Sequence, residues 1–175
     1  MSIIFLLFVL VVALNIWNKQ DWYDVLDYEN NLYRYGLRLR FDKGINPALR
    51  NACLKFAAWL RQEYEFPIRV PIYFKNKICL RCVDGDTAYG TCFLPDSYKN
   101  YPYIRIAVGD YEDLCRIWGE KDATLSILRT LAHELTHYYQ WINGVSLSHE
   151  SEERQAVNTS KFIIEYYLGF INNDF

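Results

Sequence analysis

Three residues in the last third of the chain have the types and spacing of a metal-dependent hydrolytic site. His133, Glu134 and His137 form an H-E-x-x-H pattern within the segment "LAHELTHYYQW". Side chains four residues apart share one face of a helix, so both imidazoles can bind a single ion. The Glu134 carboxylate, one step around the helix, can take a proton from a water molecule that the metal activates. The pattern predicts two metal ligands and a general base.

The helix around this motif has two different sides. His133, His137 and Gln140 share one side, whereas the apolar residues gather on the opposite one: Leu128, Leu131, Leu135, Tyr139 and Ile142. The histidines therefore face a second surface, where a cleft could form. The ordinary alternative is a pair of surface or core histidines without a ligand. Because the chain has only 3 His and two of them make the motif, we favour the metal site.

A third ligand is required, because catalytic zinc takes three protein groups and leaves one position for water. The downstream segment "SHESEERQAVNTSKF" offers four donors: His149, Glu150, Glu152 and Glu153. On a helix, Glu153 shares a face with the small residues Ala156 and Ser160, which leave room for an ion between two helices. Glu153 is the predicted third ligand and His149 the alternative. The other carboxylates suit an acidic helix start, which the helix dipole favours.

The two motifs together resemble a known family. "HELTH", followed by a turn and then "ERQA", resembles the gluzincin group of zinc metallopeptidases, and is most similar to ImmA/IrrE-like peptidases and minimal HtpX-like peptidase domains. The resemblance implies a zinc metalloendopeptidase that hydrolyses peptide bonds. It also implies Zn²⁺ as cofactor, His133, His137 and Glu153 as its ligands, and Glu134 as the base. By the same analogy, a strand at residues 103–108 lies along the cleft, where an extended substrate pairs with its edge.

Two alternatives remain open. "HELTHYYQWINGV" is also similar to SprT-like proteases, whose third ligand is a histidine after the helix, which implies His149. Those proteases act on DNA-bound proteins, whereas this chain has a net charge of -2 and no basic excess, so we expect a peptide or protein substrate and no nucleic-acid partner. The second alternative is a zincin fold without catalysis that acts as a binding or regulatory protein.

The elements around the motif predict an α+β fold: a small zincin-like domain in which a short mixed sheet packs against helices, including the H-E-x-x-H helix. The high share of hydrophobic residues, 51%, excludes a disordered chain. Periodicity and turn signals predict helices from Asn46-Pro47 to Pro67 and over residues 110–118, 123–142 and 150–168, and strands over residues 68–74, 78–83, 91–94 and 103–108. Asp122 is the expected cap of the long helix.

The first residues form a separate hydrophobic segment. Residues 3–14 are all apolar, and the run extends to residue 17 past one asparagine. It is shorter than the roughly 20 residues of a spanning helix, so a signal or short anchor is the preferred interpretation. We expect a hydrophobic segment at residues 1–18 and one zincin-like domain over 19–175. This predicts a membrane-anchored or secreted protein; a cytoplasmic one, with the segment packed on the domain, is the alternative.

Cysteines and tyrosines complete the set of reactive side chains. The 5 cysteines cannot all pair, and the C-x-x-C at Cys79 and Cys82, with Cys92 nearby, is interpreted as structural thiols or one disulfide, with metal or redox chemistry as the alternative. Tyr138, Tyr166 and Tyr167 are candidates by position for stabilising an oxyanion, although core packing is the ordinary role of such residues.

Overall fold

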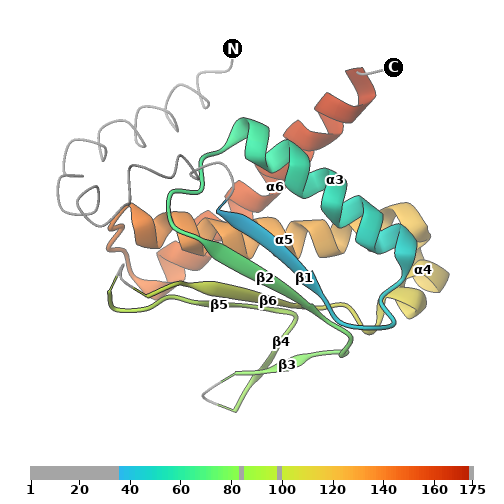
Figure 1. Cartoon of the computed structure of the whole chain (residues 1–175), viewed down its shortest axis with the longest axis horizontal. Helices are drawn as coiled ribbons and strands as arrows, with labels where there is room; N and C mark the ends of the chain where they lie inside the picture. Colours follow the sequence, from blue (N-terminus) through green and yellow to red (C-terminus); the bar gives the residue numbers. More distant parts are fainter. Residues whose placement is uncertain (1–35, 83–84, 98–99, 174–175) are drawn as a thin grey trace.

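Helices cover one face of a small mixed sheet in the computed structural model, which describes residues 36–82, 85–97 and 100–173 (Figure 1). The elements of this part are β1 (Leu37–Phe41), α3 (Pro47–Glu63), β2 (Val70–Lys75), β3 (Leu80–Arg81), β4 (Thr87–Ala88), β5 (Gly90–Phe93), β6 (Tyr103–Ala107), α4 (Tyr111–Trp118), α5 (Glu120–Ile142) and α6 (His149–Asn173). The predicted α+β class, with a short mixed sheet packed against the motif-bearing helix, is confirmed.

The main sheet has the strand order β1-β2-β6-β5. β1, β2 and β6 are parallel, and β5 runs antiparallel to β6. β3 and β4 pair with each other in a separate two-stranded sheet. The expectation that residues 103–108 form the edge of the sheet is wrong, because β5 folds back onto β6 and covers it. β5 is the edge strand on this side of the sheet, and it contacts α5.

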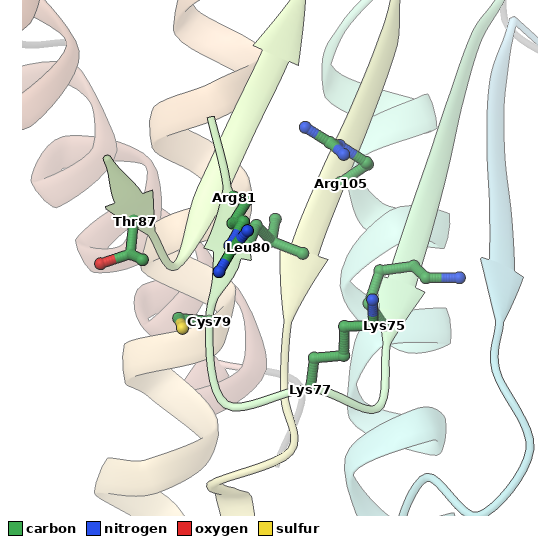
Figure 2. Close-up of a pocket in the computed structure, with 7 residues that line it drawn as sticks. All are labelled: Lys75, Lys77, Cys79, Leu80, Arg81, Thr87 and Arg105. Atoms are coloured by element: carbon green, nitrogen blue, oxygen red, sulfur yellow. The ribbon is translucent and has the colours of Figure 1, made fainter. Parts of the chain in front are cut away.

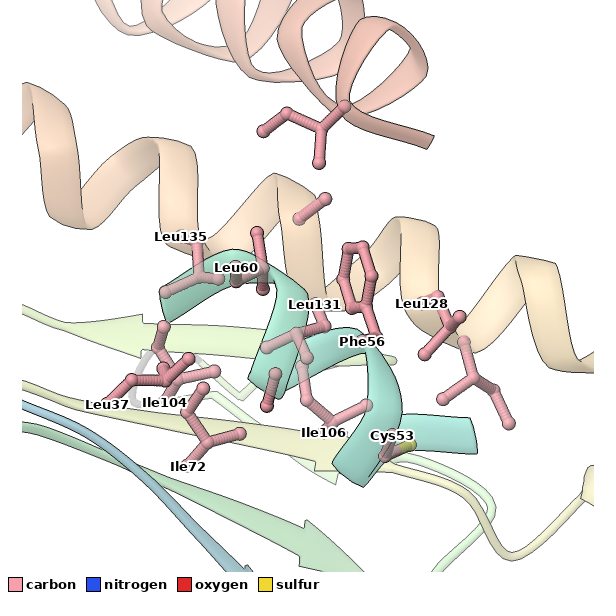
Figure 3. Close-up of a cluster of buried hydrophobic side chains, with 14 of the residues drawn as sticks. Leu37, Cys53, Phe56, Leu60, Ile72, Ile104, Ile106, Leu128, Leu131 and Leu135 are labelled. Carbon is pink, nitrogen blue, oxygen red and sulfur yellow. The ribbon is translucent and has the colours of Figure 1, made fainter. Parts of the chain in front are cut away.

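The core lies between the sheet and the helices. In β2, Val70, Ile72 and Phe74 are buried, while Tyr73 and Lys75 alternate with them and point to the other face. Figure 3 shows Leu37, Ile72, Ile104 and Ile106 of the sheet beneath Phe56 and Leu60 of α3 and Leu128, Leu131 and Leu135 of α5. The buried leucines of α5 fix which side of this helix faces the sheet. They make up most of the apolar side that the sequence predicted for it.

Three aromatic side chains attach the end of α5 to the loops around the sheet. The Tyr138 hydroxyl donates to the Ile68 carbonyl at 2.7 Å and accepts from the Ile68 N–H at 3.2 Å. The Tyr139 hydroxyl donates to the carbonyl of Glu65, and the Trp141 indole donates to that of Pro95. These bonds fix both the rotation and the position of the helix that carries the motif.

Several element boundaries differ from the sequence-based prediction. β1 and β4 were not predicted, and of residues 78–82, the described part of the strand expected at 78–83, only Leu80–Arg81 form a strand. α5 begins at Glu120 with Gly119 as its N-cap, so Asp122 is not the cap; it lies in the first turn. Gly119 takes a φ of 84°, a conformation that favours glycine, and this residue both ends α4 and begins α5.

No helix in residues 36–82, 85–97 and 100–173 is long and apolar enough to cross a membrane. The hydrophobic segment at residues 1–18, with the proposed membrane contact at residues 3–17, lies outside the described residues. The prediction of an anchored or secreted protein therefore stays a prediction, as does the domain boundary at residue 19.

Candidate metal centre

The two histidines of α5 face one another on the side of the helix away from the sheet core. Their Nε2 atoms are 3.2 Å apart. The side chains are partly exposed, 22% for His133 and 16% for His137. The neighbours Ala132 and Leu135 are buried, so the helix separates a core side from a half-open side, as the periodicity predicted. Two imidazole nitrogens are thus presented at a surface that solvent can reach.

Glu153 on α6 completes the group. Its Oε2 is 3.3 Å from His133 Nε2, and its Oε1 is 3.2 Å from His137 Nε2. Within the described part of the chain, these three residues are the one group of His, Cys, Asp and Glu side chains that could hold a metal ion. Ala156 and Ser160, one and two turns further along α6, are buried, as expected if small residues let the two helices approach. His149 is exposed at the start of α6 and lies outside the group.

The donor set and its spacing fit zinc. Two imidazoles and one carboxylate form a known catalytic zinc set, and ligands roughly 2.0–2.2 Å from a tetrahedral ion lie about 3.3 Å from each other. The His133–His137 separation is close to that spacing, and each oxygen of the Glu153 carboxylate lies at a similar distance from one of the two histidines, so one of these oxygens would be the ligand. Three protein donors with a partly exposed side also leave a position open for water, as a catalytic site requires. The group can therefore hold a metal ion.

Gln140 orients His137. Its amide Nε2 donates to the Glu152 carbonyl at 3.0 Å and to Gln155 Oε1 at 2.9 Å, which leaves its Oε1 facing His137 Nδ1 at 2.8 Å. Because that oxygen can only accept, Nδ1 carries the proton and Nε2 keeps its lone pair for the metal. Both of the amide's acceptors belong to α6, so one side chain also ties the ligand-bearing helices together.

Glu134 lies against β5 beside the histidines. It is 7% exposed, and a Cβ placed on Gly90 would come within 2.4 Å of its Oε1, so glycine permits this close approach. Burial and, to a smaller extent, the Glu153 charge raise the pKa of Glu134 to about 8. No side chain of the described residues donates a hydrogen bond to this carboxylate. A bound dication would favour its charged form, which is the form that accepts a proton.

The pKa of His133 moves in the opposite direction. Burial lowers it, and the neighbouring charge of His137 adds to this effect, whereas Glu153 raises it. The net result favours the neutral imidazole near neutral pH, which is the form that binds metal.

The tyrosines considered as oxyanion donors lie elsewhere. Tyr138 is fully buried and bonded to Ile68. Tyr166 donates to Glu63 on α3, and Tyr167 packs against Phe56 and Trp59. The hydroxyls of Tyr138 and Tyr166 are thus bonded away from the metal centre. The preferred packing role holds for Tyr138 and Tyr167, which are buried, whereas Tyr166 is 42% exposed.

All five cysteines are free thiols, so the disulfide alternative is wrong. Cys79 is exposed and Cys82 half-buried, and neither belongs to a metal-binding group among the described residues. Cys92 on β5 is half-buried near the motif helix. Burial, together with the charge of Glu134, raises the pKa of its thiol, which keeps it in the neutral form.

Sequence reasoning missed two residues of the centre. It placed Gln140 on the histidine side but gave it no role, and it gave none to Gly90. The available signal was a glycine inside a short strand, which often marks a close approach by another group.

A search of protein-family models, of curated proteins and of solved structures finds no match for this chain.

Proposed function

We propose that the protein is a zinc metallopeptidase. The observation that carries the proposal is the convergence of His133, His137 and Glu153 from two helices. The Glu134 carboxylate is near enough for the charge of Glu153 to raise its pKa. The H-E-x-x-H motif and the "ERQA" segment support the same proposal through their resemblance to gluzincins. His149 lies outside the group, so the glutamate-ligated arrangement is preferred to the SprT-like one.

Each residue has a defined role in this proposal. His133, His137 and Glu153 hold the ion, and bound zinc supplies a Lewis acid that polarises a carbonyl and makes water more acidic. Glu134 takes the proton of the attacking water and delivers it to the leaving amine. Gln140 keeps the His137 ring in the tautomer that binds metal. The half-open side of the group admits the substrate.

The edge of β5 supports a peptide as the substrate. β5 pairs with β6 on one side, and no described strand pairs with its other side. Gly90 of β5 contacts Glu134, so a chain added to this strand would run past the general base. An extended peptide can add to such an edge through main-chain hydrogen bonds. The sequence predicted that the substrate pairs with a strand at residues 103–108; we assign that pairing to β5 instead.

The proposal is tested on the purified full chain by metal analysis and by cleavage of a casein-type substrate. We expect one zinc per chain and measurable cleavage. Glu134→Gln should keep the zinc and lose a factor of about 10² to 10⁴ in activity, because only the base is removed. Glu153→Gln should lose both zinc and activity.

Glu150→Gln is the matched control, since Glu150 is an exposed carboxylate of α6 that pairs with Arg154 rather than with the histidines. It should behave as the wild-type protein. Bound zinc without any cleavage would favour the binding or regulatory alternative. Absence of zinc, or unchanged cleavage in Glu134→Gln, would contradict the proposal.

A further inference from the structure

A second site lies on the far face of the sheet from the metal centre. A cavity of about 450 Å³ opens between the sheet and β3, lined by Lys75, Lys77, Cys79, Leu80, Arg81, Thr87 and Arg105. Figure 2 shows Arg105 on β6, Arg81 on β3, Lys75 at the end of β2 and Lys77 in the loop that follows; the Lys75 side chain points away from the two arginines, toward β1. Arg105 points to this face because its neighbours Ile104 and Ile106 are buried on the helix side.

The cavity is strongly cationic although the chain as a whole is weakly acidic, with a net charge of -2. Four of its lining residues are Lys or Arg, and none is acidic. Asp42 forms an ion pair with Lys75 at 2.7 Å, and its charge also interacts with Lys77. Within the described residues, no carboxylate pairs with Arg81 or Arg105. Among the ion pairs of the described residues, Lys75 is the one of these four cations that pairs with a carboxylate, which leaves the charges of Lys77, Arg81 and Arg105 for a ligand.

One guanidinium is already oriented. Arg105 Nε donates to the Thr91 hydroxyl at 3.1 Å, and this bond leaves both terminal amino groups of Arg105 available. A guanidinium held in this way can bind two oxygens of one phosphate with little further loss of side-chain freedom. Lys77 and Arg81 are exposed and supply mobile charges on either side of it.

We propose that this cavity binds a ligand with two adjacent phosphate groups. A diphosphate carries about as many negative charges as there are unpaired cations, and Arg favours the planar, two-oxygen contact that phosphate offers. The volume exceeds that of a diphosphate, so the group that carries it also has room. Tyr73, opposite Arg105 in the strand register, gives that group an aromatic neighbour on the same face, where it is 38% exposed. The site is independent of the zinc chemistry.

Calorimetric titration of the full chain with inorganic pyrophosphate tests the proposal. We expect saturable one-to-one binding at physiological salt. The double variant Lys77→Gln/Arg105→Gln should weaken it by about 100-fold, roughly tenfold for each charge removed. Lys55→Gln/Lys161→Gln removes two exposed lysines from α3 and α6 and should leave binding unchanged. Pyrophosphate bound at the metal centre would be unaffected by the first pair, so the two sites are distinguished.

Two further experiments test the chemistry and the source of the ligand. Citrate should bind more weakly than pyrophosphate, because its carboxylates lack phosphate geometry; equal binding would overturn the assignment. Pyrophosphate should reduce binding to vesicles of anionic phospholipid but not to neutral vesicles, a comparison that cancels any contribution of the hydrophobic segment at residues 1–18. Vesicle binding without pyrophosphate binding, or a double variant that binds as the wild type, would refute the proposal. If the double variant unfolds, Arg81→Gln replaces it, since Arg81 is exposed on β3.

Discussion

At the scale of single residues, the Gln140 amide holds a metal ligand in place and links the two helices of the metal centre. It accepts from one ligand of α5 and donates twice to α6. Gln140→Leu removes all three bonds but keeps a similar side-chain volume. We expect the affinity for zinc to fall by about 10- to 100-fold, the usual effect of losing an outer partner of a ligating histidine.

Competition with a fluorescent chelator measures this affinity. Gln62→Leu, at an exposed position of α3, is the matched control and should bind zinc as the wild type does. Unchanged zinc affinity in Gln140→Leu would show that the His137 ring is held by other groups.

The raised pKa of Glu134 predicts how stability depends on pH. Its folded value of about 8 lies above the ordinary value of 4.5, so the folded state holds a proton that the unfolded state releases between these limits. The resulting stabilisation is complete below the ordinary value and is lost as pH rises towards and through 8. The metal-free protein should therefore lose up to about 1.4 kcal/mol of unfolding free energy per pH unit in this window.

Urea unfolding of the chelator-treated protein between pH 6.5 and 8 checks this prediction. The range begins at the ordinary pKa of His133, 6.5, and the lowered pKa of this group affects stability mainly at more acidic pH. Glu134→Gln removes the titrating group, so its unfolding free energy should change less over this range than that of the wild type. Parallel curves for the two proteins would contradict the assignment.

Residue types and spacing were sufficient to predict the core of the site. The H-E-x-x-H spacing identified three residues, and the small side chains after Glu153 selected it over His149, which the structure places outside the group. The role of Gln140 depends on carbonyls of α6, and that of Gly90 on the contact between β5 and α5. Both arise from the packing of distant segments, which no local spacing encodes.

At the scale of elements, the contact between β5 and α5 places the general base. Gly90→Ala would set a Cβ within 2.4 Å of Glu134 Oε1 and 2.8 Å of Thr130 Cγ2. The carboxylate or the strand must then shift. We expect turnover to fall by at least about tenfold, because displacement of a base by a fraction of an ångström is costly. Zinc content should remain, since the three metal ligands are on other residues.

Casein-type cleavage and metal analysis measure the two effects separately. Gly169→Ala is the control: Gly169 lies on α6 with nothing within 4 Å of a new Cβ, so activity should be unchanged. A wild-type turnover in Gly90→Ala would mean that Glu134 does not act from the position described.

The strands were less predictable than the helices. "LRLRF" of β1 alternates clearly, yet five residues give a weak signal, and β1 was missed. The interior position of β6 depends on which strands pair with it, and pairing is a non-local property. The start of α5 was misplaced because Gly119, through its positive φ, begins the helix without a side-chain bond, whereas Asp122 has the residue type of a cap.

At the scale of the whole molecule, metal binding and folding are linked. The ligands lie on two helices, so an ion bound between them stabilises the folded state alone. With zinc at about 1,000 times its dissociation constant, we expect the free energy of unfolding to rise by about 4 kcal/mol. Thermal unfolding with zinc and with chelator measures this difference.

Glu153→Gln should unfold at nearly the same temperature under both conditions, because one donor is missing. A wild-type protein whose unfolding is insensitive to chelator would contradict the metal site and would favour an accidental motif.

The three metal donors all lie on α5 and α6, consecutive helices that pack along each other, whereas the parallel pairs β1–β2 and β2–β6 join segments distant in sequence. Local contacts form sooner than distant ones during folding. The helical hairpin can therefore assemble, and capture an ion, before the sheet is complete. Glu134 reaches its position against Gly90 only when β5 docks. A full-length chain that refolds in the presence of zinc would thus acquire metal first and a correctly placed base last, so that the zinc-loaded intermediate is inert until the fold is finished.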